Sequence, residues 1–178
     1  LSPDGRYIAL TMRAPENTDV IVYDIERNTS TRLTFDPGVD RMPFWSPDGE
    51  RVYFQSDRDG IPNIYSKAVD GTGQVERVTS SDTAQFPDVM TKDGQWIVVW
   101  SNRGTGDIDI LSMESVPIVD IEATIQTPYN EGFSSVSPDG RWMAYSSQES
   151  GQFEVYVRPF PNVEDGRWQI SRDGGEPS

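Results

Sequence analysis

The turn sequence Ser-Pro-Asp-Gly occurs three times in this chain, at residues 2–5, 46–49 and 137–140. A degenerate copy, Thr-Lys-Asp-Gly, occupies residues 91–94, so that successive copies begin 44, 45 and 46 residues apart. Self-similarity at a period of about 40–45 residues, with several strands in each repeat, is typical of β-propeller blades. We therefore predict a single propeller segment, with repeats that span approximately residues 1–45, 46–90, 91–136 and 137–178.

Each repeat contains short runs of β-branched and aromatic residues that are bounded by Gly, Pro, Asn and Asp, as expected of strands joined by turns. The first run of the four repeats spans residues 6–10, 51–54, 95–99 and 141–145, and the second spans 20–23, 64–65, 108–111 and 155–157. A third, weaker run ends near residues 33–34, 78–79, 125–127 and 170–171, and a fourth run, at 43–45, 87–90 and 133–136, leads into the next turn. The sequence thus predicts an all-β fold, a β-propeller of four-stranded antiparallel blades with four repeats per chain. We expect Trp45, Trp96 and Trp142, in or beside these runs, to pack between blades.

The repeated turn has a physical reason. Proline presets φ at the first central position of a type I turn, aspartate fits the second, and glycine supplies the left-handed position that closes a three-residue hairpin. The turn therefore joins two antiparallel strands in each repeat. We interpret its aspartates as structural rather than catalytic.

The two ends of the chain keep the phase of the repeat. Residues 177–178 joined to residues 1–5 read Pro-Ser-Leu-Ser-Pro-Asp-Gly, which matches the internal segment 43–49 in register. The repeat is therefore cut within the innermost strand. Two arrangements stay open: the C-terminal residues complete the first blade and close a ring within one chain, or two chains form a homodimer that completes a larger ring. Because Leu1 lies inside a repeat, we expect the chain to be a piece of a longer or processed protein.

Composition narrows the function. A net charge of −14 and a pI near 4.2 disfavour binding to nucleic acid or to an anionic membrane. No stretch approaches the roughly 18 consecutive apolar residues of a membrane span, so this segment is not expected to insert into a membrane. The chain has no His and no Cys, which excludes Ser-His-Asp and Cys-His catalysis and zinc held by those residues. We predict that this chain is not an enzyme and that any catalytic domain lies outside it.

Carboxylates are the remaining ligands for a cofactor or metal. Asp107 and Asp109 with Asn102 have the oxygen atoms that Ca²⁺ prefers, and an equivalent loop holds Asp57, Asp59 and Asn63. Neither loop has the ligand order of a known calcium loop, and solvated turns have the same composition. We therefore expect no cofactor and no metal, with Ca²⁺ as the weaker alternative.

One face of the predicted propeller is the best candidate for binding. Two classes of loop share the face around the channel mouth, where propellers usually hold partners: the loops 56–60, 101–104 and 147–151, and the loops 35–42, 80–86, 128–132 and 172–176 that lead into the innermost strands. Arg41, Arg58 and Arg103 are candidate contacts because a planar guanidinium suits carboxylate recognition. Tyr129 and Glu131 are further candidates. In the alternative interpretation, the arginines form salt bridges with Asp residues of neighbouring blades.

Residues 43–49, followed by 52–58 and 63–65, resemble the PD40 (WD40-like) repeat of TolB propellers. The resemblance covers all four periods, with the third repeat departing most. A narrower likeness, over residues 126–131, 133–147, 154–161 and 166–177, is to the C-terminal propeller of certain bacterial serine/threonine kinases, although no kinase domain is present in this chain. The resemblance implies a bacterial sensor or interaction module in the periplasm or another extracytoplasmic location.

Three hypotheses follow. The first is a non-catalytic propeller scaffold that binds a protein or peptide, either TolB-like or as a sensor module of a larger protein. The second is the substrate-gating propeller of a prolyl-oligopeptidase-like serine peptidase, whose triad would lie in a separate domain. The third is a carbohydrate-binding or carbohydrate-active propeller with acidic catalytic residues. The absence of His and Cys favours the first.

Overall fold

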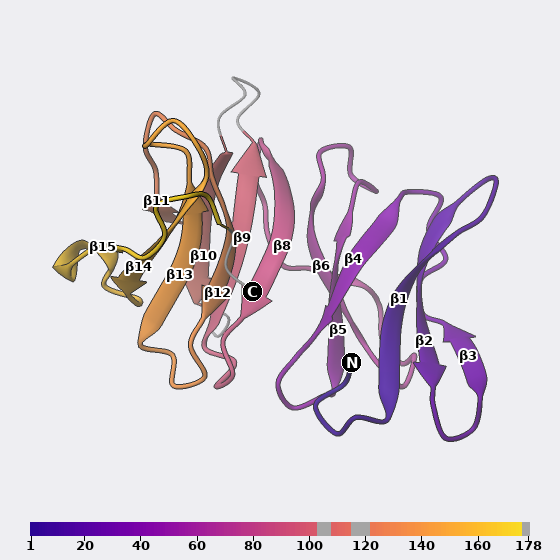
Figure 1. Ribbon diagram of the computed structural model, residues 1–178. Coiled ribbons are helices and arrows are strands. Elements are labelled where there is room, and N and C mark those ends of the chain that lie inside the picture. The colour runs from indigo at the N-terminus through magenta and orange to yellow at the C-terminus, as the bar shows by residue number, and fades with distance from the viewer. Residues whose placement is uncertain (103–107, 115–121, 176–178) are drawn as a thin grey trace. The chain divides into compact units, whose positions relative to one another are not determined.

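The computed structural model describes residues 1–102, 108–114 and 122–175. Arg103, Asp107 and the C-terminal residues 176–178 therefore lie outside the described residues. The described chain forms four antiparallel sheets, which confirms the predicted all-β class with one sheet per repeat (Figure 1). It divides into two compact units, Leu1–Pro87 and Asp88–Ser178, with two sheets associated with each.

In the first unit, one sheet has the order β1-β2-β3 and the other the order β4-β5-β6-β7. Their strands are β1 (Tyr7–Arg13), β2 (Thr18–Asp24), β3 (Thr29–Arg32), β4 (Asp40–Trp45), β5 (Arg51–Ser56), β6 (Asn63–Ala68) and β7 (Glu76–Arg77). Each sheet is built from consecutive strands joined antiparallel, so the innermost strand β4 comes from the end of one sequence repeat and β5–β7 from the next. This is the phase that the sequence predicts. Completion of the first blade by residues 176–178 falls outside the described residues.

The other two sheets have the orders β11-β10-β9-β8 and β12-β13-β14-β15. Their strands are β8 (Ala84–Met90), β9 (Trp96–Asn102), β10 (Ile108–Glu114), β11 (Glu122–Ile125), β12 (Glu131–Val136), β13 (Trp142–Ser147), β14 (Glu154–Pro159) and β15 (Trp168–Gln169), with the 3-10 turn η1 (Val163–Asp165) between the last two. The boundary between the units lies within β8. No helix among the described residues has the length and apolarity that a membrane crossing requires.

The repeated turn has the predicted hairpin geometry. In the second copy, the Gly49 N–H donates to the Ser46 carbonyl at 2.9 Å, and Gly49 has a φ of 74°. The Ser46 hydroxyl donates to Asp48, whose carboxylate also accepts the backbone N–H of Glu50. These bonds hold the pKa of Asp48 below its usual value. The aspartate is thus a structural acceptor within its own turn.

The outer strands end slightly earlier than the apolar runs predict. In the first sheet, the N–H groups of Leu33 and Thr34 both donate to the Val20 carbonyl, at 2.9 and 3.3 Å, so the regular ladder stops at Arg32. The Val20 N–H instead donates to the Thr34 hydroxyl at 3.0 Å. Leu33 nevertheless stays buried, which explains why the apolar run continues beyond the strand.

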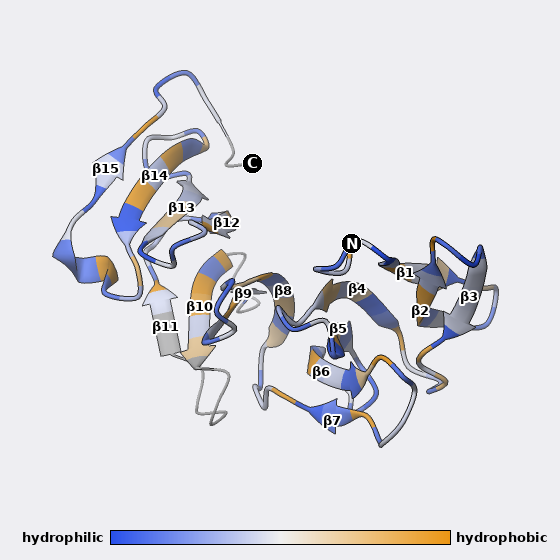
Figure 2. Cartoon of the chain, turned by 90° about the horizontal axis from the view of Figure 1, so that it is seen from below, coloured by the Kyte–Doolittle hydropathy of each residue, from blue (hydrophilic) through white to orange (hydrophobic). Residues whose placement is uncertain are grey.

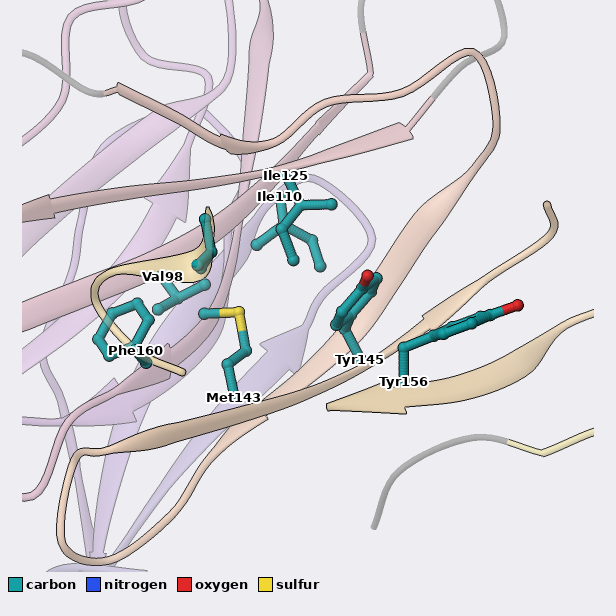
Figure 3. Packing of buried hydrophobic residues seen from close by; sticks show 8 residues of the cluster. Val98, Ile110, Ile125, Met143, Tyr145, Tyr156 and Phe160 are labelled. Atoms are coloured by element: carbon teal, nitrogen blue, oxygen red, sulfur yellow. The ribbon is translucent and has the colours of Figure 1, made fainter. Parts of the chain in front are cut away.

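Each unit has its own core between paired sheets. In the first unit, Trp45 packs 6.3 Å from Tyr7 beside a cluster that includes Val20, Val52 and Phe54. The second unit buries the cluster drawn in Figure 3, which consists of Val98, Ile110, Ile125, Met143, Tyr145, Tyr156, Phe160 and Val163. Strands in both units show alternating orange and blue bands in Figure 2, as expected for elements whose side chains alternate between faces.

Trp96 and Trp142 differ in their surroundings although they hold the same position after the repeated turn. Trp96 packs edge-on against Phe160 of the next sheet, with ring centroids 5.5 Å apart. Trp142 contacts Trp168 of its own sheet and is 42% exposed. Packing between blades is therefore seen for Trp45 and Trp96, and the expectation for Trp142 is not met within its unit.

Candidate functional site

Arg58 forms a buried ion pair within its own sheet. It lies in the loop between β5 and β6, and one of its Nη atoms donates to both carboxylate oxygens of Asp40 at 3.0 Å. Asp40 begins β4 and is fully buried. The guanidinium also lies over the rings of Phe54 and Tyr65, 5.7 and 4.9 Å from their centres. Arg58 therefore holds its loop to β4, and its partner belongs to the same sheet rather than to a neighbouring blade.

Arg41, the second residue of β4, is anchored without an acidic partner. Its Nε donates to Gln55 Oε1 at 2.6 Å, and its Cζ lies 5.8 Å from the centre of the Phe86 ring. Among the described residues, no carboxylate lies within ion-pair distance of Arg41. Gln55 and Phe86 thus fix the position of the guanidinium while its two Nη groups keep their donors for another ligand.

Arg41 lines a hollow of about 580 Å³ in the first unit, together with Thr11, Arg13 and Met42. The Thr11 hydroxyl oxygen accepts the backbone N–H of Met42 at 3.1 Å, which ties β1 to β4 at the hollow. Arg13 is exposed and, like Arg41, has no carboxylate at ion-pair distance within the described part of the chain. The hollow therefore brings two uncompensated guanidinium groups together.

Thr11 and Arg13 are not among the candidates that the sequence suggests, although the pattern of β1 contains a signal for them. Side chains alternate along a strand, so residues 7, 9, 11 and 13 share one face. The first two of these residues pack against the core of the first unit, and the last two line the hollow. Whether residues 11 and 13 are covered depends on the position of β4 beside β1, which the sequence does not predict.

The backbone of Met42 is strained. Its φ of 54° lies in the left-handed region, which costs a non-glycine residue roughly 1–2 kcal/mol. The register of β4 against β5 shifts between Arg41 and Phe44, as in a β-bulge, and bulges re-aim side chains. Phe133 repeats the feature in β12 with a φ of 50°, and both side chains are exposed. Strain of this kind clusters at functional sites.

Tyr129 and Glu131 lie close in sequence in the second unit but differ in environment. Tyr129 is 45% exposed in the loop before β12. Glu131 is buried, and its Oε1 accepts hydrogen bonds from the hydroxyls of Thr127 and Ser147. Burial raises the pKa of Glu131, the two hydroxyls oppose this effect, and the nearby Asp109 carboxylate adds to it. Of the two, Tyr129 is accessible to a partner and Glu131 is not.

In the loop of the second repeat, the residues considered for calcium are engaged in ordinary contacts. Asp57 accepts the backbone N–H of Val39 at 2.7 Å, and Asp59 accepts the Tyr65 hydroxyl at 2.7 Å. Asn63 is fully buried. Within the described ranges, no group of three or more carboxylates is placed to hold a metal ion.

A larger hollow, of about 690 Å³, lies at the other end of the paired sheets of the first unit, and its lining includes Tyr7, Asp24 and Arg27. Its one arginine is paired, because Asp24 lies 3.9 Å from Arg27 and 3.2 Å from Arg6, and its other charged side chains, Glu50 and Asp70, are acidic. The hollow at Arg41 is therefore the better candidate for an anionic ligand.

Residues 1–158 match the PD40 family, described as the TolB beta propeller domain. The chain belongs to this family. The match includes all four residues that line the Arg41 hollow, and it confirms the resemblance drawn from the repeated turn.

Related proteins are bacterial. The chain is 30% identical over 109 residues to the Tol-Pal system protein TolB of Wolinella succinogenes. The matched region covers 61% of this chain and 25% of that protein. It is 39% identical over 166 residues to an uncharacterised protein of Agrobacterium fabrum, and this matched region covers 90% of this chain and 54% of that protein. The chain thus spans between a quarter and about half of the length of these relatives.

Solved structures agree on the fold. TolB of Acinetobacter baumannii matches with a TM-score of 0.82 at 24% identity, over 99% of this chain and 43% of that one. A puromycin-hydrolysing peptidase of Mycobacterium tuberculosis matches with a TM-score of 0.75 at 18% identity, over 98% of this chain and 28% of that one. At these identities the likenesses show a shared propeller architecture.

Proposed function

We propose that this TolB-like propeller domain is a non-catalytic binding module that holds a protein or peptide partner at the loops leading into its innermost strands. Arg41 carries the proposal. It is fixed by Gln55 and Phe86 and it lines a hollow. Within the described part of the chain, it has no carboxylate partner such as the one that neutralises Arg58 in the same sheet. Pre-positioned donors of this kind favour binding because little side-chain entropy is lost when the ligand arrives.

We further propose a periplasmic or otherwise extracytoplasmic location in a bacterium, as a TolB-like protein or as the sensor part of a larger one. The relation to Tol-Pal system proteins of bacteria supports this. The net charge of −14 is consistent with a protein partner and opposes a nucleic acid. A homodimer that completes a larger ring is compatible with the same role.

The gating alternative gains no specific support from the peptidase likeness, because that likeness concerns the fold alone. Nor does any group of residues in the described structure favour the carbohydrate alternative. Both remain distinguishable from peptide binding by experiment.

A peptide-display library selected on the immobilised chain, in parallel with a glycan array, tests the proposal. We expect enriched peptides that bind the purified chain saturably in calorimetry. Binding should weaken at least tenfold in Arg41→Ala and stay unchanged in Arg141→Ala, an exposed arginine of the second unit that lies beside the repeated turn and outside the loops of the candidate face. Glycan binding without peptide binding, or the absence of saturable peptide binding, would contradict the proposed function. Peptide binding that is indifferent to Arg41 would place the partner on another surface.

A further inference from the structure

Arg13 and Arg41 are exceptional within an acidic chain. The protein has 29 acidic and 15 basic residues, so carboxylates are plentiful. Most of the described arginines have a carboxylate within ion-pair distance, including Arg6, Arg32 and Arg58. Two arginines that line one hollow and yet lack such a partner in the described chain leave positive charge uncompensated at a single place.

The hollow also supplies hydrogen-bonding groups in a fixed arrangement. Arg41 is held through its Nε by Gln55, which leaves its Nη donors for a ligand. The Thr11 oxygen accepts the N–H of Met42, so the hydroxyl hydrogen of Thr11 is directed elsewhere and can be donated to an anion. A planar carboxylate matches the forked donors of a guanidinium better than a spherical anion does.

The size of the hollow supports binding of a small chemical group that belongs to a larger ligand. A volume of about 580 Å³ is within the range of pockets for small ligands, and it accommodates a side chain or a chain terminus. The bulge that places Met42 at the hollow in a left-handed conformation supplies an apolar surface beside the two arginines. A charged head with an attached hydrocarbon stem fits this combination.

We propose that the hollow formed by Thr11, Arg13, Arg41 and Met42 is a carboxylate-binding site, which takes an acidic side chain or the C-terminal carboxylate of a peptide. The inference rests on the proposed function, and it specifies the chemistry that the partner presents. Arg41 and Arg13 neutralise the carboxylate, Thr11 adds one hydrogen bond, and Met42 contacts the stem.

Titration of three peptides into the chain, followed by NMR of the arginine Nε–H signals, tests the site. The probes are Ac-Gly-Asp-Asp-Gly-NH₂, its Asn-Asn counterpart, and Ac-Gly-Gly-Gly with a free C-terminus. We expect saturable shifts of the Arg13 and Arg41 signals with at least one carboxylate probe, and binding at least tenfold weaker for the Asn-Asn peptide. The probe that binds more tightly identifies side chain or terminus as the source.

Two variants and one control assign the binding to the hollow. Arg13→Gln and Arg41→Gln should each weaken binding of the carboxylate probe at least tenfold, whereas Arg141→Gln, at an exposed arginine outside the loops of the candidate face, should leave it unchanged. Arg13 is exposed and makes no ion pair within the described chain, so Arg13→Gln tests the site even if the loss of the Arg41–Gln55 bond disturbs folding. Equal binding of the Asn-Asn peptide, equal loss in Arg141→Gln, or tighter binding of inorganic phosphate overturns the proposal.

The two proposals can fail separately. If peptides selected by display bind with affinity that Arg13→Gln and Arg41→Gln leave intact, the carboxylate site is wrong and a binding function persists elsewhere. If the carboxylate probe binds as expected but no peptide of greater length and no protein binds, the site is correct and the proposed function falls.

Discussion

Arg58 and Arg41 are expected to differ sharply in what their removal does to stability. Arg58→Ala leaves the buried Asp40 carboxylate without its cation, which costs about 3–5 kcal/mol in comparable pairs. Arg41→Ala removes one hydrogen bond to a neutral side chain and should cost about 1 kcal/mol. Urea unfolding of both variants and the wild type provides the comparison. Similar losses for the two would show that Arg41 also has a structural partner.

This contrast marks the limit of sequence reasoning about single residues. Arg41, Arg58, Tyr129 and Glu131 are equivalent candidates in the sequence, because loop position and residue type say nothing about the groups that surround a side chain. The fold neutralises Arg58 with Asp40 and buries Glu131, while it leaves Arg41 and Tyr129 accessible. Arg13 is not a candidate in the sequence because the apolar run 6–10 ends before it, whereas β1 extends to Arg13.

Glu131 is expected to make stability depend on pH. Its folded pKa is raised by burial, so the folded state binds the proton more tightly than the unfolded state does. The stability contribution is therefore present below the usual glutamate pKa and is lost as the pH rises through the folded value. Glu131→Gln keeps the Oε1 acceptor for Thr127 and Ser147 but has no proton to lose, so its stability does not fall in this way as the pH rises. Its stability relative to wild type should increase from pH 4 to pH 8 in denaturant titrations; a constant difference contradicts the assignment.

At the scale of elements, β6 and β14 each begin at a buried polar residue that hydrogen-bonds to a hydroxyl group just beyond the outer strand of the same sheet. In the second sheet, Thr79 accepts the N–H of Ile64 at 2.9 Å and donates to Asn63 at 2.9 Å. Ser171 plays the same part for Val155 and Glu154. The sequence shows a Thr or Ser at the end of each weak third run. Whether its hydroxyl replaces a backbone partner depends on where the hydrogen-bond ladder of the outer strand stops, which the sequence does not show.

Thr79→Val tests this element. The change keeps the shape of the side chain and removes both hydrogen bonds, so a buried N–H loses its acceptor, at a cost of about 1–3 kcal/mol. Thr79→Ser keeps the hydroxyl and serves as the matched control. We expect the thermal midpoint of the valine variant to fall well below that of the serine variant, and equal midpoints would remove the proposed role.

At the scale of the whole molecule, the repeat period predicts the number of sheets, their antiparallel order and their phase, because these follow from local turn chemistry. It does not predict which sheet faces become covered. The N–H groups of Leu33 and Ile170 donate to equivalent carbonyls, of Val20 and Val155, yet their environments differ. Leu33 is 2% exposed beneath the next sheet, whereas Ile170 is 62% exposed.

The uncovered face of the β12–β15 sheet leads to a prediction about association. Trp142, Trp168 and Ile170 leave a large apolar area of this sheet accessible within its unit, and such areas in soluble proteins usually mark contacts with another surface. We expect light scattering on the purified chain to show a mass above that of the 20.0 kDa monomer that rises with concentration. Ile170→Asp should lower it without loss of the β-sheet circular dichroism signal. Ile25→Asp, at an exposed position in the first unit, is the matched control and should leave the mass unchanged. A wild-type chain that stays monomeric at every concentration, with a stability that Ile170→Asp reduces, would instead favour a ring closed within one chain.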